Sequence, residues 1–349
     1  MLSAPAVDVP VAPEVTQAAE TVPEKHYTHH DGRGPTVHRT NPVFVHRDIS
    51  HLAVADGMNV LEIGTGSGYS GALLAHLTGP AGSVTSVDID GYLTRWANLI
   101  HHRRGLTQIR CHTADGTGGY PDAGPYDRIG AWCAPPLLPK AWVDQSTEGG
   151  RIVSTLPVAP VPDLTVLAVL RVTGGRPEIE AVTGGNYIDT TPSPKVDLDL
   201  PGRWIDWETR TPDHCWISIA WRGRDDWHHA GARAALERLA DPAHTEPAPA
   251  EVSWKPLQYW AAATADEGLT LARFDGGMVF GHSTAASAAA LTKDGRLIAD
   301  APDSPSLAVV RGWIDGWNAA GRLARDDYTP LLVPADGPDG TGWNLRLTR

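Results

Sequence analysis

Short hydrophobic runs alternate with helical periodicity between about residues 58 and 172 of this 349-residue chain. The runs at 60–63 and 83–87 have the length and composition of buried strands. The segment 92–103 instead spaces its apolar residues for one face of a helix, at Leu93, Trp96, Ala97 and Ile100. Strands that alternate with helices form a parallel sheet covered on both faces. The sequence therefore predicts a doubly wound α/β fold, with further strands at 109–112, 125–132, 151–156 and 164–172 and helices at 69–77 and 138–145.

The pattern changes beyond residue 190. The prolines and charges of 190–202 are typical of a linker, and ten of the thirteen tryptophans follow it. Strand-like pieces at 216–221 and 269–274 alternate there with helical pieces at 230–239 and 306–323, and 241–250 is expected to be a surface loop. This indicates a smaller α+β domain. Its tryptophans are expected mainly in a core, because large rings are usually buried, although such a density also suits an aromatic binding surface.

These observations divide the chain into three parts. Residues 1–21 are rich in Ala, Pro, Val and Glu without stable periodicity, and they are predicted to be a flexible N-terminal arm. Residues 22–192 form the predicted α/β domain, and residues 193–349 the Trp-rich α+β domain.

The stretch from Val60 to Tyr69 joins the first strand to the first helix through a glycine-rich turn. Glycine stands at alternate positions 64, 66 and 68, so the backbone can pass close to a ligand. The following helix directs its free N–H groups and its positive end to the same space. The spacing differs from the G-x-G-x-x-G of dinucleotide sites, and no phosphate-binding lysine follows. The pattern resembles motif I of S-adenosylmethionine methyltransferases, which have a Rossmann-like fold.

Two acidic residues follow later strands of the predicted sheet. Asp88 ends the second strand about 20 residues after the glycine turn, where such folds place a carboxylate on ribose hydroxyls; the alternative is a helix N-cap. Asp115 and Gly116 follow the third strand and are expected to meet the adenine, or else to form a simple Asp-Gly turn. The residues expected to bind the cofactor are Glu62, Gly64, Thr65, Gly66, Ser67, Gly68, Asp88, Asp115 and Gly116.

Composition excludes several classes of function. A formal charge of −12 argues against a protein that tracks nucleic-acid phosphates. Cys111, Cys133 and Cys215 have no C-x-x-C spacing, and the histidine-rich segment 22–51 fits no zinc pattern, so neither disulfides nor a metal are expected. The chain shows no signal peptide and no membrane-spanning run, which leads us to expect a cytoplasmic protein without a nucleic-acid or membrane partner.

Over roughly residues 20–190 the chain resembles the protein-L-isoaspartate O-methyltransferase (PIMT) family. The segment 60–69 is similar to its motif I, Asp115-Gly116 to its second motif, and 125–129 with Ala134-Pro135, Asp144-Gln145 and 149–153 to its later segment. Two elements differ. Glu24 follows Val22-Pro23 where the family has arginine, and Thr40-Asn41-Pro42 replaces the Ser-x-Pro turn of its active site.

The resemblance implies an O-methyltransferase that uses S-adenosyl-L-methionine, releases S-adenosyl-L-homocysteine, and methylates the carboxylate of an Asp or isoAsp residue. It makes Thr40 the expected catalytic residue, whose hydroxyl donates to the target carboxyl, and places substrate on Thr40, Asn41 and Pro42. A plain turn hydroxyl is the alternative for Thr40.

The added carboxyl-terminal domain resembles the branch of the family that tailors an Asp of ribosomally synthesised and post-translationally modified peptides (RiPPs), in lanthipeptide, lasso peptide or graspetide biosynthesis. In that role the second domain recognises substrate, and the methyl ester closes to a succinimide (aspartimide) that can hydrolyse to isoAsp. The alternatives are general repair of isoAsp in proteins and a non-catalytic regulator that binds S-adenosylmethionine or peptide.

Overall fold

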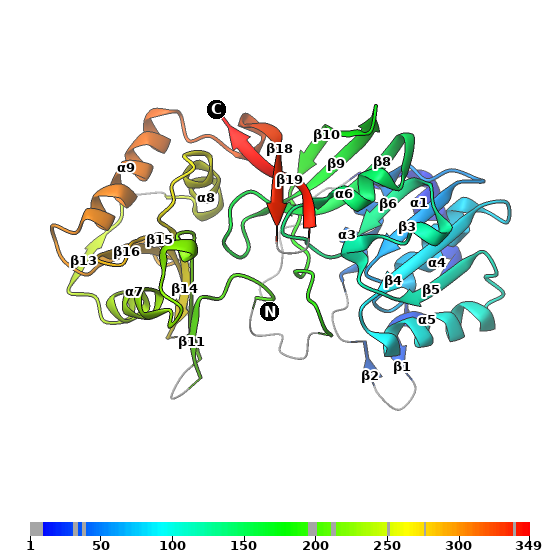
Figure 1. Ribbon diagram of the computed structural model, residues 1–349, viewed down its shortest axis with the longest axis horizontal. Coiled ribbons are helices and arrows are strands. Elements are labelled where there is room, and N and C mark those ends of the chain that lie inside the picture. Colours follow the sequence, from blue (N-terminus) through cyan, green and yellow to red (C-terminus); the bar gives the residue numbers. More distant parts are fainter. Residues whose placement is uncertain are drawn as a thin grey trace.

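The computed structural model describes residues 10–30, 34–36, 40–194, 201–210, 214–249, 252–275, 277–337 and 340–349. Parts of the predicted arm (1–9), histidine-rich segment (31–33 and 37–39) and linker (195–200) lie outside the described residues. The described chain forms two large sheets with their helices, and a small third sheet lies between them (Figure 1).

The alternating pattern of the first half forms a seven-stranded sheet in the order β10-β9-β8-β6-β3-β4-β5. The five strands from β8 to β5 are parallel to their neighbours, whereas β9 and β10 pair antiparallel at one edge. The bounds are β3 Asn59–Ile63, β4 Ser83–Asp88, β5 Ile109–Thr113, β6 Tyr126–Ala131, β8 Ser146–Pro157, β9 Thr165–Thr173 and β10 Arg176–Thr183.

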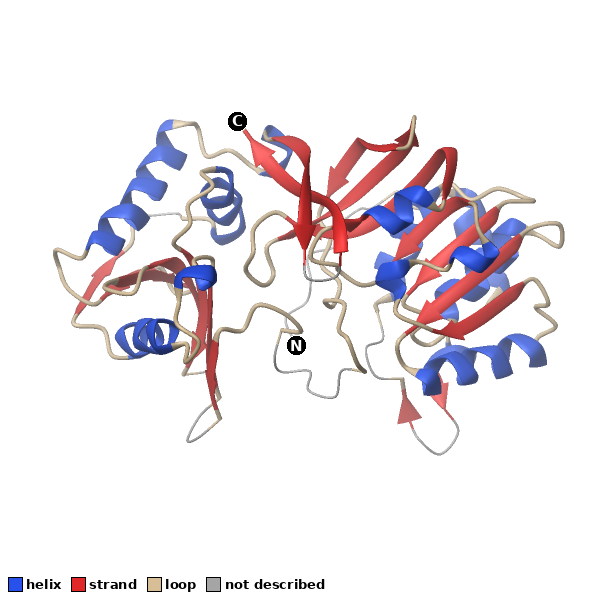
Figure 2. Ribbon diagram, viewed as in Figure 1, coloured by secondary structure: helices blue, strands red, loops and turns tan. Residues whose placement is uncertain are grey.

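Helices cover both faces of this sheet, as Figure 2 shows. Successive side chains of a strand point to opposite faces. On β3, Val60 therefore joins the core beneath one set of helices, while Leu61 and Ile63 join the core on the other face. The helices of this half are α1 Pro13–Thr21, α2 Lys25–Thr28, α3 Pro42–Leu52, α4 Tyr69–Thr78, α5 Gly91–Arg103 and α6 Lys140–Asp144, with short 3₁₀ turns η1 Gly116–Gly118 and η2 Pro121–Ala123.

The chain leaves β3 to build β4 and β5 on one side and later returns to build β6 on the other. The strand order therefore reverses between β3 and β6. Ligands of open α/β sheets bind outside the carboxyl ends of the strands at such a point. The fold thus places a crevice where the glycine turn follows β3.

The second large sheet is antiparallel, in the order β11-β12-β14-β15-β16-β17-β13. Helix α7 Ala230–Ala240 packs on one face, whereas α8 Trp254–Ala263 and α9 Pro305–Ala319 cover the other (Figure 1). The predicted mixture of strands and helices is confirmed. The strands are β11 Trp207–Thr209, β12 Cys215–Ile219, β13 His244–Pro247, β14 Leu269–Phe274, β15 Gly277–Ser283, β16 Ala288–Thr292 and β17 Arg296–Ala299, with 3₁₀ turns η3 Arg222–Arg224 and η4 Arg325–Asp327.

Several tryptophans of this half are buried in its hydrophobic core. Trp216, Trp221, Trp260, Trp313 and Trp317 are at most 8% exposed. Trp227 is the contrast, since 82% of it is exposed. The interpretation of the tryptophans as mainly core residues is therefore supported.

The C-terminal hairpin joins the two halves. Strands β18 Thr329–Gly337 and β19 Gly340–Thr348 form a three-stranded sheet with β7 Leu138–Pro139, a short strand of the first half. The pairing runs through Trp343 and Leu138. The last strands of residues 193–349 therefore belong to a sheet shared with the α/β half.

Other elements also differ from the sequence predictions. Residues 13–21 of the expected flexible arm form α1, in which Val15 and Ala18 are buried against α3 and α4. Part of the expected loop at 241–250 is β13, which pairs with β17. Strand β10 was not predicted, because its exposed edge position leaves few apolar residues. The short hairpin β1 His29–His30 and β2 Gly34–Pro35 completes the fold. Among the described helices, none has the length and hydropathy needed to cross a bilayer.

Trp142 on α6 offers a test of how the core supports the crevice. The side chain is fully buried, and its Nε1 donates to the backbone oxygen of Gly116 at 2.8 Å. Trp142→Phe removes this bond and part of the ring volume, so we expect a loss of about 2–4 kcal/mol of unfolding free energy. Trp227→Phe is the matched control at an exposed site, with an expected change within about 0.5 kcal/mol. Urea unfolding followed by far-UV circular dichroism measures both, and equal midpoints for the two variants would contradict the packing role of Trp142.

Candidate functional site

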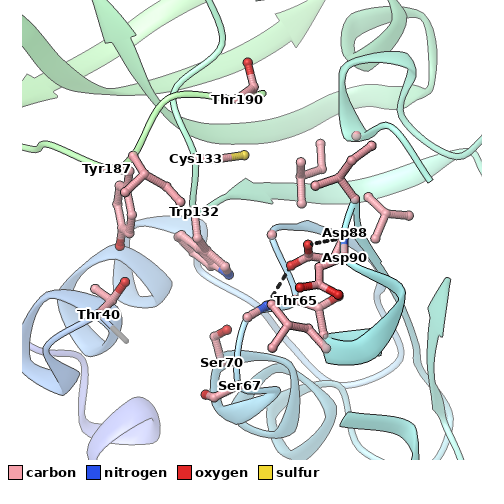
Figure 3. Close-up of a pocket in the computed structure, with 18 of the residues that line it drawn as sticks. Thr40, Thr65, Ser67, Ser70, Asp88, Asp90, Trp132, Cys133, Tyr187 and Thr190 are labelled. Atoms are coloured by element: carbon pink, nitrogen blue, oxygen red, sulfur yellow. Dashed lines mark hydrogen bonds between the residues drawn. The ribbon is translucent and has the colours of Figure 1, made fainter. Parts of the chain in front are cut away.

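A cavity of about 460 Å³ lies at the carboxyl ends of β3, β4 and β6 (Figure 3). One wall is the glycine turn after β3, and another is the end of β4 with the start of α5. The remaining walls are the loop after β6, the start of α3, and the segment 186–191, which follows β10. The cavity thus occupies the crevice that the strand order creates.

The glycine turn has the backbone conformation that its sequence requires. Gly64, Gly66 and Gly68 have φ angles of 92°, 51° and 87°, which favour glycine over residues with a side chain. Gly64 N–H donates to the backbone oxygen of Val87 at 2.8 Å, and Gly66 N–H donates to Asp88 Oδ2 at 2.9 Å. The turn is therefore fixed to the end of β4.

Most of the residues predicted in the turn reach the cavity. Gly64, Thr65, Gly66 and Ser67 line it. Gly68 does not, because it packs against α5: a Cβ at this position would lie 2.8 Å from Ala97 Cβ. Its glycine is needed for the close approach of α4 and α5, and its predicted contact with the cofactor is replaced by this structural role.

Glu62 also lies behind the cavity wall and not in it. Its carboxylate is fully buried and accepts hydrogen bonds from Ser70 Oγ at 2.5 Å, Ser86 Oγ at 2.6 Å and Trp132 Nε1 at 2.9 Å. Burial raises the pKa of Glu62 from 4.5 to about 7, against the opposing effect of these three donors. The prediction that Glu62 contacts the cofactor is corrected accordingly, since its oxygens bond to α4, β4 and the loop after β6.

The two predicted acids after strands both line the cavity. Asp88 accepts from Gly66 N–H through Oδ2 and from Asp90 N–H through Oδ1, each at 2.9 Å. The alternative role as a helix N-cap belongs to Asp90, whose Oδ1 accepts from Tyr92 N–H at 2.7 Å. Asp115 caps η1 through Thr117 N–H and also faces the cavity together with Gly116, and its contact with adenine stays a prediction.

The residues predicted to contact substrate lie at the start of α3. Thr40 and Asn41 line the cavity, and Figure 3 shows Thr40 on the side opposite Asp88 and Asp90. Asn41 is the N-cap of α3, with its Oδ1 accepting from Val43 N–H at 3.0 Å. Pro42 is not among the lining residues, and it occupies the first turn of α3, where its ring favours the helical φ.

One wall of the cavity was not predicted from the sequence. The segment 186–191 runs beside the loop after β6, with Ala134 N–H donating to Ile188 O at 2.8 Å and Thr190 N–H donating to Ala134 O at 2.9 Å. Tyr187 anchors it by donating its hydroxyl to Asp48 Oδ2 of α3 at 2.7 Å. No periodicity marks this segment in the sequence. Cys133, in the loop that follows β6, also lines the cavity together with Trp132.

The charge of the cavity is negative. Five acidic residues line it, and none of its described lining residues is Lys, Arg or His; the acids are Glu24, Asp88, Asp90, Asp115 and Asp189. Such a wall favours a cationic ligand. Burial raises the pKa of the Cys133 thiol to about 12, so this cysteine is a neutral lining group and not a thiolate nucleophile. No group of three metal-ligating side chains occurs among the residues that the structure describes.

The raised pKa of Glu62 makes stability depend on pH in a defined direction. The folded state holds the proton more tightly than the unfolded chain, so the contribution is complete below pH 4.5 and is lost as pH rises to about 7. The shift corresponds to a change on the order of 3 kcal/mol. We expect Glu62→Gln to flatten the fall in urea midpoint between pH 4.5 and pH 7. Glu14→Gln, at an exposed position of α1, is the control, and an identical pH profile for Glu62→Gln and the unsubstituted protein would refute the assignment.

Comparison with known proteins places the α/β half in a family. The family model described as protein-L-isoaspartate(D-aspartate) O-methyltransferase (PCMT) matches residues 12–193, more than half of the chain. The match begins one residue before α1 and ends beyond the segment 186–191. It thus includes every wall residue up to Thr191.

Individual relatives agree with the family model. A protein-L-isoaspartate O-methyltransferase of Anaeromyxobacter dehalogenans is 38% identical over 165 residues, which cover 47% of this chain and 76% of the relative. One of Methanoculleus marisnigri is 41% identical over 129 residues, covering 37% of this chain and 56% of the relative, so the match spans little more than half of that protein. A solved structure of a protein-L-isoaspartate O-methyltransferase is 15% identical, with a TM-score of 0.47 over 97% of this chain and 95% of its own.

The structure confirms the predicted α/β fold class, and the family model confirms the predicted family. The more specific branch that tailors ribosomal peptides is not distinguished by them. The chain belongs to the protein-L-isoaspartate(D-aspartate) O-methyltransferase family.

Proposed function

We propose that this chain is an S-adenosylmethionine-dependent carboxyl O-methyltransferase that acts on an aspartyl or isoaspartyl side chain of a protein or peptide. The observation that carries the proposal is one cavity in which the glycine turn and Asp88 lie opposite Thr40. Direct methyl transfer needs the cofactor on one side of the cavity and, on the other, a protein hydroxyl that orients the substrate.

The residues of the cavity fit the cofactor. Its sulfonium is cationic, and the five acidic lining residues provide a complementary charge. The turn from Gly64 to Ser67 would hold the methionine part, Asp88 the ribose hydroxyls, and Asp115 with Gly116 the adenine. The bound cofactor supplies an electrophilic methyl group, and the protein supplies position and a water-poor surrounding.

The target carboxylate needs little chemical activation. It is already ionised at neutral pH, so its oxygen can attack the methyl carbon without a general base, while the sulfur–methyl bond breaks. The same acidic wall that suits the sulfonium repels the target carboxylate, because both carry negative charge. Hydroxyl donors must therefore orient the substrate, and Thr40 and Thr190 are lining residues that can do so. The methyl ester is then open to attack by the next backbone nitrogen, which closes a succinimide and releases methanol.

The second half of the chain supports a dedicated substrate. Arg203, beyond the region that the family model matches, donates through Nη2 to the backbone oxygen of Thr190 at 2.8 Å and to its Oγ1 at 2.5 Å. The second half thus contacts the cavity wall directly. We propose that residues 193–349 recognise substrate, and that this substrate is a modified ribosomal peptide whose Asp is converted to a succinimide. General repair of isoAsp is the second candidate, because the matched relatives bear the name of that activity.

Mass spectrometry of reactions with S-adenosylmethionine separates these functions. The substrates are several unrelated isoAsp peptides and the lanthipeptide, lasso or graspetide precursor encoded beside the gene. We expect the precursor alone to gain the mass of one methylene and then lose methanol. Methylation of many unrelated isoAsp peptides would establish repair instead. No mass change on any substrate would contradict an enzymatic role and favour a regulator.

The Thr40 hydroxyl provides the test of the substrate side. Thr40→Val removes the donor at nearly constant volume, and we expect kcat/KM for the methylated substrate to fall about 10- to 100-fold, because a bond that orients the reacting carboxylate is lost. Thr40→Ser retains the hydroxyl and should keep most of the activity. Calorimetric titration with S-adenosylhomocysteine checks that both variants keep the cofactor affinity. Equal activity of Thr40→Val and Thr40→Ser would show that Thr40 is only a turn residue.

A further inference from the structure

A second cavity, of about 710 Å³, lies between α2, β1 and α5. It lies beside the cavity of Figure 3, which we call the cofactor cavity because we propose that it binds S-adenosylmethionine. In Figure 1, α5 and the β1–β2 hairpin lie together at the lower right. Five side chains that line the second cavity are basic, namely Lys25, His26, His29, Arg103 and Arg104. We call this cavity the basic groove. Trp96 and Ile100 supply the apolar part of its surface.

The groove differs in charge from the rest of the chain. The protein has 41 Asp and Glu residues against 29 Lys and Arg residues, yet none of the described residues that line the groove is acidic. Lys25, His26, His29, Arg103 and Arg104 make no ion pair with any described residue. Gathering like charges without counter-charges is unfavourable. An anionic ligand would relieve this repulsion.

A favourable interaction with the helix dipole explains the position of only some of these basic residues. Arg103 and Arg104 stand at the C-terminal end of α5, where cations interact favourably with the helix dipole. Lys25 and His26 belong to a different helix, and His29 belongs to β1. The convergence of three elements on one groove is therefore not accounted for by the end of α5.

Helix α2 lies between the two cavities. Glu24 and Thr28, four residues apart, line the cofactor cavity, whereas Lys25 and His26 line the groove. Residues four apart share a helical face, so α2 presents different faces to the two cavities. A helix with its side chains is about 10–12 Å wide, and an extended peptide advances about 3.3 Å per residue. Three or four residues of substrate would thus span from one cavity to the other.

We propose that the basic groove binds an acidic segment of the peptide substrate, about three to five residues away from the aspartyl or isoaspartyl residue that enters the cofactor cavity. This inference rests on the proposed function. Acidic side chains would pair with the arginines and the lysine, and an apolar residue of the segment would contact Trp96 and Ile100. The overall charge of −12 disfavours a nucleic acid as the occupant.

Direct binding tests the groove without relying on turnover. The probes are two fluorescently labelled isoAsp peptides that differ in an extension starting four residues from the isoAsp, four glutamates in one and four glutamines in the other. We expect fluorescence anisotropy at low salt to give about a tenfold lower Kd for the glutamate peptide, and a smaller ratio at high salt. The double variant Arg103→Glu/Arg104→Glu should abolish the preference, and Arg103→Gln/Arg104→Gln should reduce it.

The control reverses the same number of charges elsewhere. Lys293 and Arg346 are exposed, outside the groove, and without an ion pair among the described residues. Lys293→Glu/Arg346→Glu should therefore retain the tenfold preference. Loss of the preference in this control as well would show that the preference depends only on the net charge of the protein, and it would overturn the proposal. Competition by a single-stranded oligonucleotide at lower concentration than the glutamate peptide would also overturn it, in favour of a nucleic acid.

Methylation assays with the same peptides separate the two proposals. We expect a lower KM for the glutamate peptide than for the glutamine peptide. In Arg103→Glu/Arg104→Glu the KM of the glutamate peptide should rise to that of the glutamine peptide. This result supports the proposed function and the groove. Methylation of both peptides with equal KM and equal Kd overturns the groove and leaves the function intact. Groove-dependent binding without methylation of either peptide overturns the proposed function and leaves the acidic-segment site standing.

Discussion

The buried carboxylate of Glu62 is the constraint on which the cofactor cavity depends. It accepts hydrogen bonds from Ser70 of α4, Ser86 of β4 and Trp132 after β6, so four segments of the chain meet at two oxygen atoms. The neighbouring Gly71 leaves room for it, because a Cβ there would lie 2.8 Å from Glu62 Oε2. A buried charge is costly unless it is well paired, and removing one partner costs more than an ordinary hydrogen bond. The walls of the cavity are thus held together from behind, which leaves their front surfaces available to a ligand.

Much of the first half could be predicted because its signals are local. Strand β3, helix α4 and strand β4 follow from short apolar runs and a glycine turn whose φ angles only glycine adopts readily. The same locality placed Asp88 and Asp115 at the ends of strands. What a local pattern does not give is the direction of a side chain after folding. Glu62 and Gly68 belong to the motif, but the alternation of β3 and the packing of α4 on α5 turn them away from the cavity.

The segment 186–191 could not be found from the sequence for a different reason. It has neither strand nor helix periodicity, and its position depends on contacts with residues far away in the chain, such as Asp48 and Ala134. Strand β13 was missed because its pairing partner, β17, lies about fifty residues later. The C-terminal hairpin likewise pairs with β7, which is only two residues long. Long-range pairing decides these elements, whereas the local sequence pattern suggested only a surface loop at 241–250.

The anchoring of Tyr187 to Asp48 has a consequence for how this site can diverge. Asp48 belongs to α3, the helix whose first turn follows Thr40, so Thr40 and the wall at 186–191 are connected through this helix. The glycine turn is fixed separately, to β4. Changes at Ile188, which is 43% exposed, can therefore reshape this wall of the cavity while the glycine turn stays as it is. Under the proposed function, evolution can therefore exchange the methyl acceptor without rebuilding the site of the methyl donor.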